Sequence, residues 1–188
     1  MKRSSLLAAT LLASTFAVSA VPARAAEQTV MVGGQAMYPN KNIVANAVNS
    51  ADHTTLVAAV KAAGLVPTLE SKGPFTVFAP TNEAFNDLPA GTVDTLVKPE
   101  NKATLTKILT YHVVPGDYTT TKLRSMILAH HGEANLKTVE GEDLTVRMNG
   151  SSNMTVTDAK GDVADITVSD VKQSNGVIQV VDKVLMPN

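Results

Sequence analysis

The sequence predicts an α+β fold whose first half is rich in helices and whose second half is rich in antiparallel strands. Up to about residue 112, apolar residues recur at helical spacing behind capping residues. From about residue 135 they alternate with polar residues, and Asn-Gly pairs predict turns between the strands. Helices followed by consecutive strands with short turns are typical of an α+β domain with an antiparallel sheet.

The helical signals begin at Asn42, which can cap an apolar stretch from Ile43 to Val48. Asp52 is expected to cap the next helix, Thr54–Ala63, whose apolar residues share one face. Gly64 follows at a position where helices commonly end. These segments predict two short helices near the start of the domain.

The middle of the chain predicts one strand between helices. Residues 75–79 (FTVFA) form an apolar strand candidate that Pro80 closes, and Thr81 can cap a helix after it. Pro99 suits the first turn of a further helix. One face of that helix carries residues at helical spacing, namely Leu105, Ile108, Leu109 and His112.

The second half predicts strands. Alternation runs through residues 144–148 and 154–156, with Asn149-Gly150 as a turn between them. Residues 166–168 mark another strand. Residues 177–181 (VIQVV) are apolar on both faces, which predicts a strand in the interior of the sheet.

The first 25 residues have the pattern of a secretory signal peptide. Lys2 and Arg3 precede the uncharged, Leu- and Ala-rich residues 6–20, and small residues lead up to Ala25. A membrane-spanning helix is the weaker interpretation, because about 20 apolar residues are needed to span a bilayer. We expect cleavage after Ala25, a secreted or periplasmic protein without a stable membrane anchor, a loose N-terminal arm at 26–36 and a domain at 37–188.

The composition excludes several classes of protein. The chain has no Cys, which removes disulfide scaffolds, thiolate zinc sites and cysteine nucleophiles. Its formal net charge is −1, and removing Lys2, Arg3 and Arg24 with the leader leaves −4, so we expect no nucleic-acid partner. No motif predicts a cofactor.

Four segments in register resemble the fasciclin domain family. In chain order, the first segment is Met37-Tyr38-Pro39 with Asn42-Ile43. The second, GPFTVFAPTNEAF (73–85), is a strand followed by Ala-Pro-Thr and the start of a helix. The third, ILTYHVVPG (108–116), contains a Tyr-His pair, and the fourth, NGVIQVVDKVLMP (175–187), is a C-terminal strand. Together they span nearly all of the chain after the leader.

The resemblance implies a wedge of antiparallel β-strands with helices packed around it. It also implies a non-enzymatic module that mediates cell-surface or matrix adhesion through protein or glycan contacts, and we expect a monomer. Residues 122–139 look longer and more irregular than the usual family passage into the strands.

The resemblance also suggests binding residues. Tyr111 and His112 form the Tyr-His pair linked to packing and adhesion in the family, although a His on an apolar helix face is more often a buried structural residue. Asp165 and Ile166 are a counterpart of an Asp-Ile pair in adhesive segments of animal members. From alternation alone, Asp165 would point outward and Ile166 inward.

His130 and His131, with Glu133, raise the question of a metal site. Adjacent His side chains point in different directions, and a closed tetrahedral site needs about four ligands. We therefore expect a solvated loop and no metal.

Two further functions stay open. A periplasmic carrier or sensor of a small apolar ligand would need a preformed apolar cavity between the sheet and the helices. A hydrolase would need a Ser or Asp within hydrogen-bond reach of His112, and no catalytic motif is present. An exposed apolar patch would instead favour adhesion.

Overall fold

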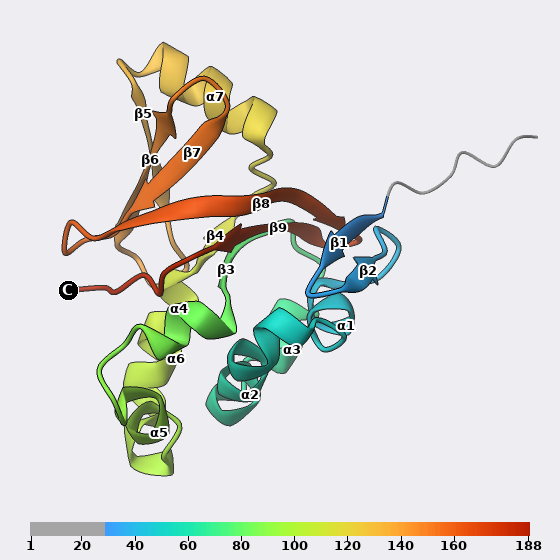
Figure 1. Ribbon diagram of the computed structural model, residues 1–188, viewed down its shortest axis with the longest axis vertical. Helices are drawn as coiled ribbons and strands as arrows, with labels where there is room; N and C mark the ends of the chain where they lie inside the picture. The colour runs from blue at the N-terminus through green and yellow to red at the C-terminus, as the bar shows by residue number, and fades with distance from the viewer. Residues whose placement is uncertain (1–28) are drawn as a thin grey trace, which may run out of the picture.

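The computed structural model describes residues 29–188 (Figure 1). The predicted signal peptide, its cleavage site and the first residues of the predicted arm lie outside the described residues.

Seven strands form one mixed sheet, and two short strands form a separate hairpin. The strands are β1 (Val30–Val32), β2 (Gln35–Met37), β3 (Phe75–Pro80), β4 (Val113–Pro115), β5 (Glu133–Lys137), β6 (Asp143–Asn149), β7 (Asn153–Thr157), β8 (Val163–Gln173) and β9 (Gly176–Val181). The order in the large sheet is β4-β3-β9-β8-β7-β6-β5, and β1 pairs with β2. The last strand of the chain therefore lies inside the sheet, between β3 and β8.

The helices cover two sides of this sheet. They are α1 (Ile43–Ala47), α2 (Thr54–Ala63), α3 (Val66–Leu69), α4 (Asn82–Asn86), α5 (Thr92–Leu96), α6 (Lys102–Tyr111) and α7 (Thr120–Ala129), with 3₁₀ turns at Ala51–His53 and Pro99–Asn101. Figure 1 shows α1 to α6 gathered below β3 and β9, whereas α7 lies on the other side, over β5 to β7. The sheet thus separates two helical layers.

Two hydrophobic cores follow from this arrangement. Val77 and Ala79 of β3 belong to the core under α1 to α6, whereas the intervening Phe78 belongs to the core under α7. In β9, Ile178 and Val181 divide in the same way. Successive side chains of a strand point to opposite faces, so β3 and β9 carry mainly apolar side chains on both faces, with Thr76 and Gln179 as buried polar exceptions.

The predicted fold class is confirmed, and several helix ends are as expected. Helix α2 spans Thr54–Ala63 and ends at Gly64, which adopts the left-handed conformation with φ of 75°. Asn42 and Thr81 cap α1 and α4 through their side-chain oxygens. The predicted Asp52 cap of α2 is wrong, because the side-chain Oδ1 of Asn82 accepts the Thr55 N–H at 3.0 Å instead.

Three other expectations need correction. The sheet is not purely antiparallel, because β3 and β9 pair in parallel from Phe75↔Gly176 to Pro80↔Val181. The predicted loose arm, residues 26–36, contains β1 and most of β2, and its Val32 is buried in the first core. The irregular stretch 122–139 holds most of α7 and all of β5, so a helix also lies in the second half.

Candidate functional site

His112 lies at the C-terminal end of α6 and is 2% exposed. Its Nδ1 is 2.9 Å from the Ile108 carbonyl oxygen, and its Nε2 accepts the backbone N–H of Leu185 at 2.9 Å. A carbonyl only accepts and an N–H only donates, so the ring is neutral with its proton on Nδ1. Burial lowers the pKa of His112 to about 4, and the Ile108 carbonyl and Asp158 oppose this shift.

Tyr111 is fully buried under α7 and the strands β5 to β8. Its hydroxyl donates to the Asp143 carbonyl at 3.0 Å and accepts the Ala159 N–H at 2.8 Å. Burial raises the pKa of Tyr111 to about 12. The structure therefore brings Tyr111 and His112 together as two interior anchors, with both polar ends occupied by backbone groups.

Asp165 and Ile166 lie on opposite faces of β8. Asp165 is exposed, its Oδ1 accepts from Asn149 Nδ2 at 3.0 Å, and its N–H donates to Asp182 Oδ1 at 2.7 Å. Ile166 packs partly buried against the second core. Asp165 is thus the more exposed of the two side chains, whereas Tyr111 and His112 are both buried.

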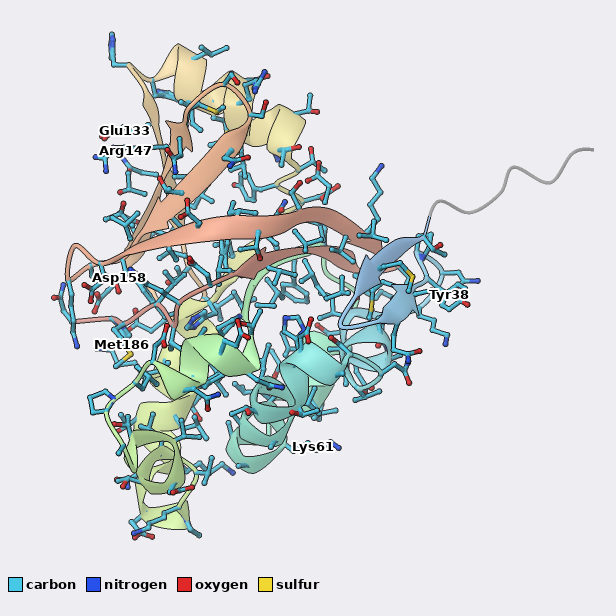
Figure 2. All side chains as sticks on the ribbon, in the orientation of Figure 1. Tyr38, Lys61, Glu133, Arg147, Asp158 and Met186 are labelled. Atoms are coloured by element: carbon cyan, nitrogen blue, oxygen red, sulfur yellow. The ribbon has the colours of Figure 1, made fainter. Side chains whose placement is uncertain are left out.

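Asp165 belongs to a polar row across four strands. The register aligns Glu133, Arg147, Thr155 and Asp165 on the outer face of β5 to β8. Figure 2 shows Glu133 and Arg147 side by side, and Arg147 Nη2 lies 2.6 Å from Glu133 Oε2. This face presents alternating charges, hydroxyls and amides without a large aromatic side chain.

The His130-His131 segment forms the exposed turn between α7 and β5. His131 has a positive φ of 58°, and both imidazoles are on the surface. Within residues 29–188, no three His, Asp or Glu side chains come together in a way that could hold a metal ion.

Three exposed apolar side chains lie on the N-terminal hairpin, directly after it and directly after α1. Met31 is 59% exposed, Tyr38 41% and Val48 46%. The side-chain amide of Asn46 hydrogen-bonds to both backbone polar groups of Tyr38. Its Oδ1 accepts the Tyr38 N–H at 3.1 Å, and its Nδ2 donates to the Tyr38 carbonyl at 2.8 Å. Lys41 Nζ lies 5.0 Å from the centre of the Tyr38 ring. We call these residues (Met31, Tyr38, Lys41 and Val48) the hairpin surface.

An apolar pocket lies beneath this surface, between α1, α2, α3 and the inner strands. Its cavity volume is about 60 Å³. The wall includes Met37, Ile43, Leu56, Leu69 and Ile178, and also the buried His53. Sequence reasoning missed this pocket, because its wall combines residues from helices and strands spread along the domain, from Val32 to Ile178.

His53 was also missed as a buried residue. It is 3% exposed, its Nδ1 lies 2.8 Å from Ser50 Oγ, and its Nε2 has no hydrogen-bond partner among the described residues. Burial lowers the pKa of His53, against the opposing effects of the Ala79 backbone and Asp52. Ser50 Oγ faces Gly33, where a Cβ would stand only 2.6 Å away, so the hydroxyl is covered.

The hydrolase criterion is not met at His112, since its described partners are backbone groups rather than a Ser or Asp side chain. The Ser50–His53 pair closes a local turn and lacks access for a substrate.

Among the helices of the described residues, none has the length and apolar character needed to cross a membrane.

An α+β wedge of strands with helices packed around it is the arrangement that the sequence resemblance predicted. The sequence model of the Fasciclin domain matches residues 51–187, so the chain belongs to the fasciclin domain family. The predicted family membership is confirmed.

Relatives support this assignment over most of the chain. Protein sll1483 of Synechocystis is 45% identical over 161 residues, which cover 86% of this chain and 82% of that protein. Immunogenic protein MPB70 of Mycobacterium bovis is 38% identical over 146 residues, covering 75% of this chain and 66% of the relative.

A solved structure has the same fold. The domain pair of the insect cell adhesion molecule fasciclin I aligns with a TM-score of 0.71 and 17% identity. The alignment covers 79% of this chain and 52% of that one, consistent with one domain matching part of a pair.

Proposed function

We propose that this fasciclin protein is an exported, non-enzymatic binding module that attaches to a protein or polysaccharide at a cell surface or in a matrix. The observation that carries the proposal is the hairpin surface, where Met31, Tyr38 and Val48 are exposed on a firmly held scaffold. Exposed aromatic residues and Met are enriched at interaction sites.

The hairpin surface is rigidly mounted. The buried Val32 and Met37 fix the hairpin to the first core, and the Ala51 N–H reaches the Gly33 carbonyl at 3.4 Å. A preordered surface loses little conformational entropy on binding, so a few anchors supply most of the affinity. Adhesion is also the role stated for the insect protein that shares the fold.

The proposed absence of catalysis rests on the same structure. Tyr111 and His112, the residues best suited by type for acid–base chemistry, use their polar atoms to hold the interior together. A group that serves as a general acid or base must reach a substrate.

Binding to intact cells, envelope polysaccharides and matrix proteins tests the adhesion proposal. The Met31→Ser/Tyr38→Ser double variant is expected to bind at least tenfold more weakly than the native protein, whereas binding should survive high salt. Leu128→Ser is the matched control, because Leu128 is 76% exposed but lies on α7. Equal binding by both variants, or no saturable binding to any surface, would contradict the proposal.

Export is tested separately by fractionating the host cells and sequencing the protein's N-terminus. We expect the protein in the periplasmic or extracellular fraction, beginning at Ala26. A cytoplasmic product that begins at Met1 would contradict export without bearing on the hairpin surface.

A further inference from the structure

We propose that the turn at Asn149-Gly150 is a site of spontaneous covalent modification, where the Asn149 side-chain amide is converted to aspartate and isoaspartate through a succinimide ring. The chain contains a second Asn-Gly pair, Asn175-Gly176, which the fold protects from the same reaction. The inference rests on the different surroundings of these two pairs, and it goes beyond the surface adhesion proposed above.

The reaction needs a backbone nitrogen that the asparagine side chain can reach. The nitrogen of the following residue forms a bond to the side-chain Cγ, the bond from Cγ to Nδ2 breaks, and ammonia leaves with the proton of the attacking N–H. Water then adds to one of the two ring carbonyls and opens the ring, which gives aspartate or isoaspartate. Glycine presents its nitrogen without a Cβ beside it, so Asn-Gly pairs react most readily.

The turn between β6 and β7 leaves Asn149 open to this attack. Asn149 is the last residue of β6, and both it and Gly150 are exposed. The Gly150 N–H has no hydrogen-bond acceptor among the described residues, and beyond its chain neighbours no atom lies within 4 Å of the place that a Cβ would take. The Asn149 side chain makes one described hydrogen bond, from its Nδ2 to Asp165 Oδ1 at 3.0 Å.

The side chain of Asn175 is held away from the following nitrogen. Asn175 is 8% exposed, and its Oδ1 accepts the Ile43 N–H at 3.0 Å. Its Nδ2 donates to the carbonyls of Leu69 and Ser71 at 2.7 and 2.9 Å, and its own carbonyl accepts the Phe75 N–H at 3.0 Å. Turning this amide toward the next nitrogen breaks all three side-chain hydrogen bonds, so the reaction at Asn175 requires local opening of the fold.

Conversion of Asn149 changes the outer face of the sheet. Asn149 Nδ2 is the donor to Asp165 Oδ1, and a carboxylate in its place has no hydrogen to donate. Each conversion adds one negative charge beside Asp165, and like charges this close repel. Isoaspartate also inserts a methylene group into the backbone at the end of β6. We therefore expect the Asp165 carboxylate to move away from residue 149 in the converted molecules.

The test incubates the purified protein at pH 8 and 37 °C in H₂¹⁸O, with and without concentrated guanidinium chloride, and follows both Asn-Gly peptides by mass spectrometry. Opening of the ring places one solvent oxygen in the product, which distinguishes new conversion from aspartate present at the start. In the folded protein we expect Asn149 to convert at least about tenfold faster than Asn175. In guanidinium chloride the two rates should be similar. Equal rates in the folded protein, or a difference that persists in the denaturant, would overturn the proposal.

Two variants of the turn test the attacking nitrogen. Gly150 has a positive φ of 76°, which Asn tolerates better than most residues, and there is room for a side chain. Gly150→Asn covers the nitrogen and should slow the conversion of Asn149 at least about tenfold. Ser152→Asn is the control, because it changes an exposed residue of the same turn without touching that nitrogen. An unchanged rate in Gly150→Asn, with a native-like spectrum, would refute the assignment.

The effect on Asp165 is measured with ¹⁵N-labelled protein. As the incubation proceeds, the amide signal of Asp165 should split into a native and a converted set. Asn149→Gln should keep a single set, because its longer side chain closes the ring far more slowly. An unsplit Asp165 signal after complete conversion would contradict the expected displacement of its carboxylate.

Discussion

The Nε2 atom of His112 accepts the backbone N–H of Leu185 at 2.9 Å, so a single imidazole joins the end of α6 to the segment that follows β9. Replacing His112 with Ala leaves the Leu185 N–H and the Ile108 carbonyl without their partner in the interior. We expect His112→Ala to lower the free energy of unfolding by about 1–3 kcal/mol. Urea denaturation measures this loss.

The exposed His130→Ala is the control for that variant and should stay within about 0.5 kcal/mol of the native protein. If His112→Ala instead kept native stability but lost binding, the structural role assigned to His112 would be wrong.

Stability should fall as the pH is lowered from 6.5 toward 4. His112 binds a proton at about pH 6.5 when unfolded but only near pH 4 when folded, so the unfolded state takes up more protons in this window. The difference is worth about 3 kcal/mol, and His53 acts in the same direction. Urea denaturation at pH 7.5 and pH 4.5 should show a smaller pH dependence for His112→Gln; an identical dependence would exclude His112 as its source.

Asn175 ties three segments together and should not tolerate a carboxylate. Its Oδ1 accepts the Ile43 N–H at 3.0 Å, and its Nδ2 donates to the carbonyls of Leu69 and Ser71 at 2.7 and 2.9 Å. Asn175→Asp replaces this donor with an acceptor facing two carbonyl oxygens. We expect a loss of about 3 kcal/mol in the free energy of unfolding at neutral pH.

Thermal denaturation of Asn175→Asp measures this effect. The control is Asn153→Asp, which changes an exposed amide on β7 and has the same net charge as Asn175→Asp. Similar melting temperatures for the two variants would show that the Asn175 amide hydrogens are not needed.

Asp165 tests whether the outer sheet face takes part in adhesion. Because its side chain is exposed, Asp165→Asn should change the free energy of unfolding by no more than about 0.5 kcal/mol. If the Asp-Ile resemblance carries function, the variant loses binding to the partner at unchanged stability. Native binding by Asp165→Asn would remove Asp165 from the binding residues and leave the hairpin surface as the candidate.

Local signals predicted the parts of the fold that depend on local chemistry. Gly64 ends α2 because the left-handed backbone conformation at this position favours glycine. Thr81 caps α4 because its side-chain oxygen can accept the N–H of Ala84, three residues further on. The apolar residues on both faces of the segment 177–181 correctly placed β9 inside the sheet. None of these features needs information from a distant segment.

Features that depend on distant partners were missed or wrong. The parallel pairing of β3 with β9 joins residues about a hundred positions apart, and nothing in either strand encodes its direction. Asn82 caps α2 from the start of α4, so the nearer Asp52 was the natural but incorrect choice. The burial of His53 likewise depends on the hairpin and on β3 covering it, which no spacing within Ala51–Ala63 reveals.

The position of β9 has a consequence for how the protein is made. The strand that unites the two cores, β9, follows β3 by about a hundred residues, so a growing chain holds β3 and β8 with open edges until β9 has been made. Long-range pairing of this kind slows folding, because the loop between the partners must close before the contacts form. The sheet is therefore expected to form only once β9 has been made, and a chain cut short before Gly176 would remain a target for proteases.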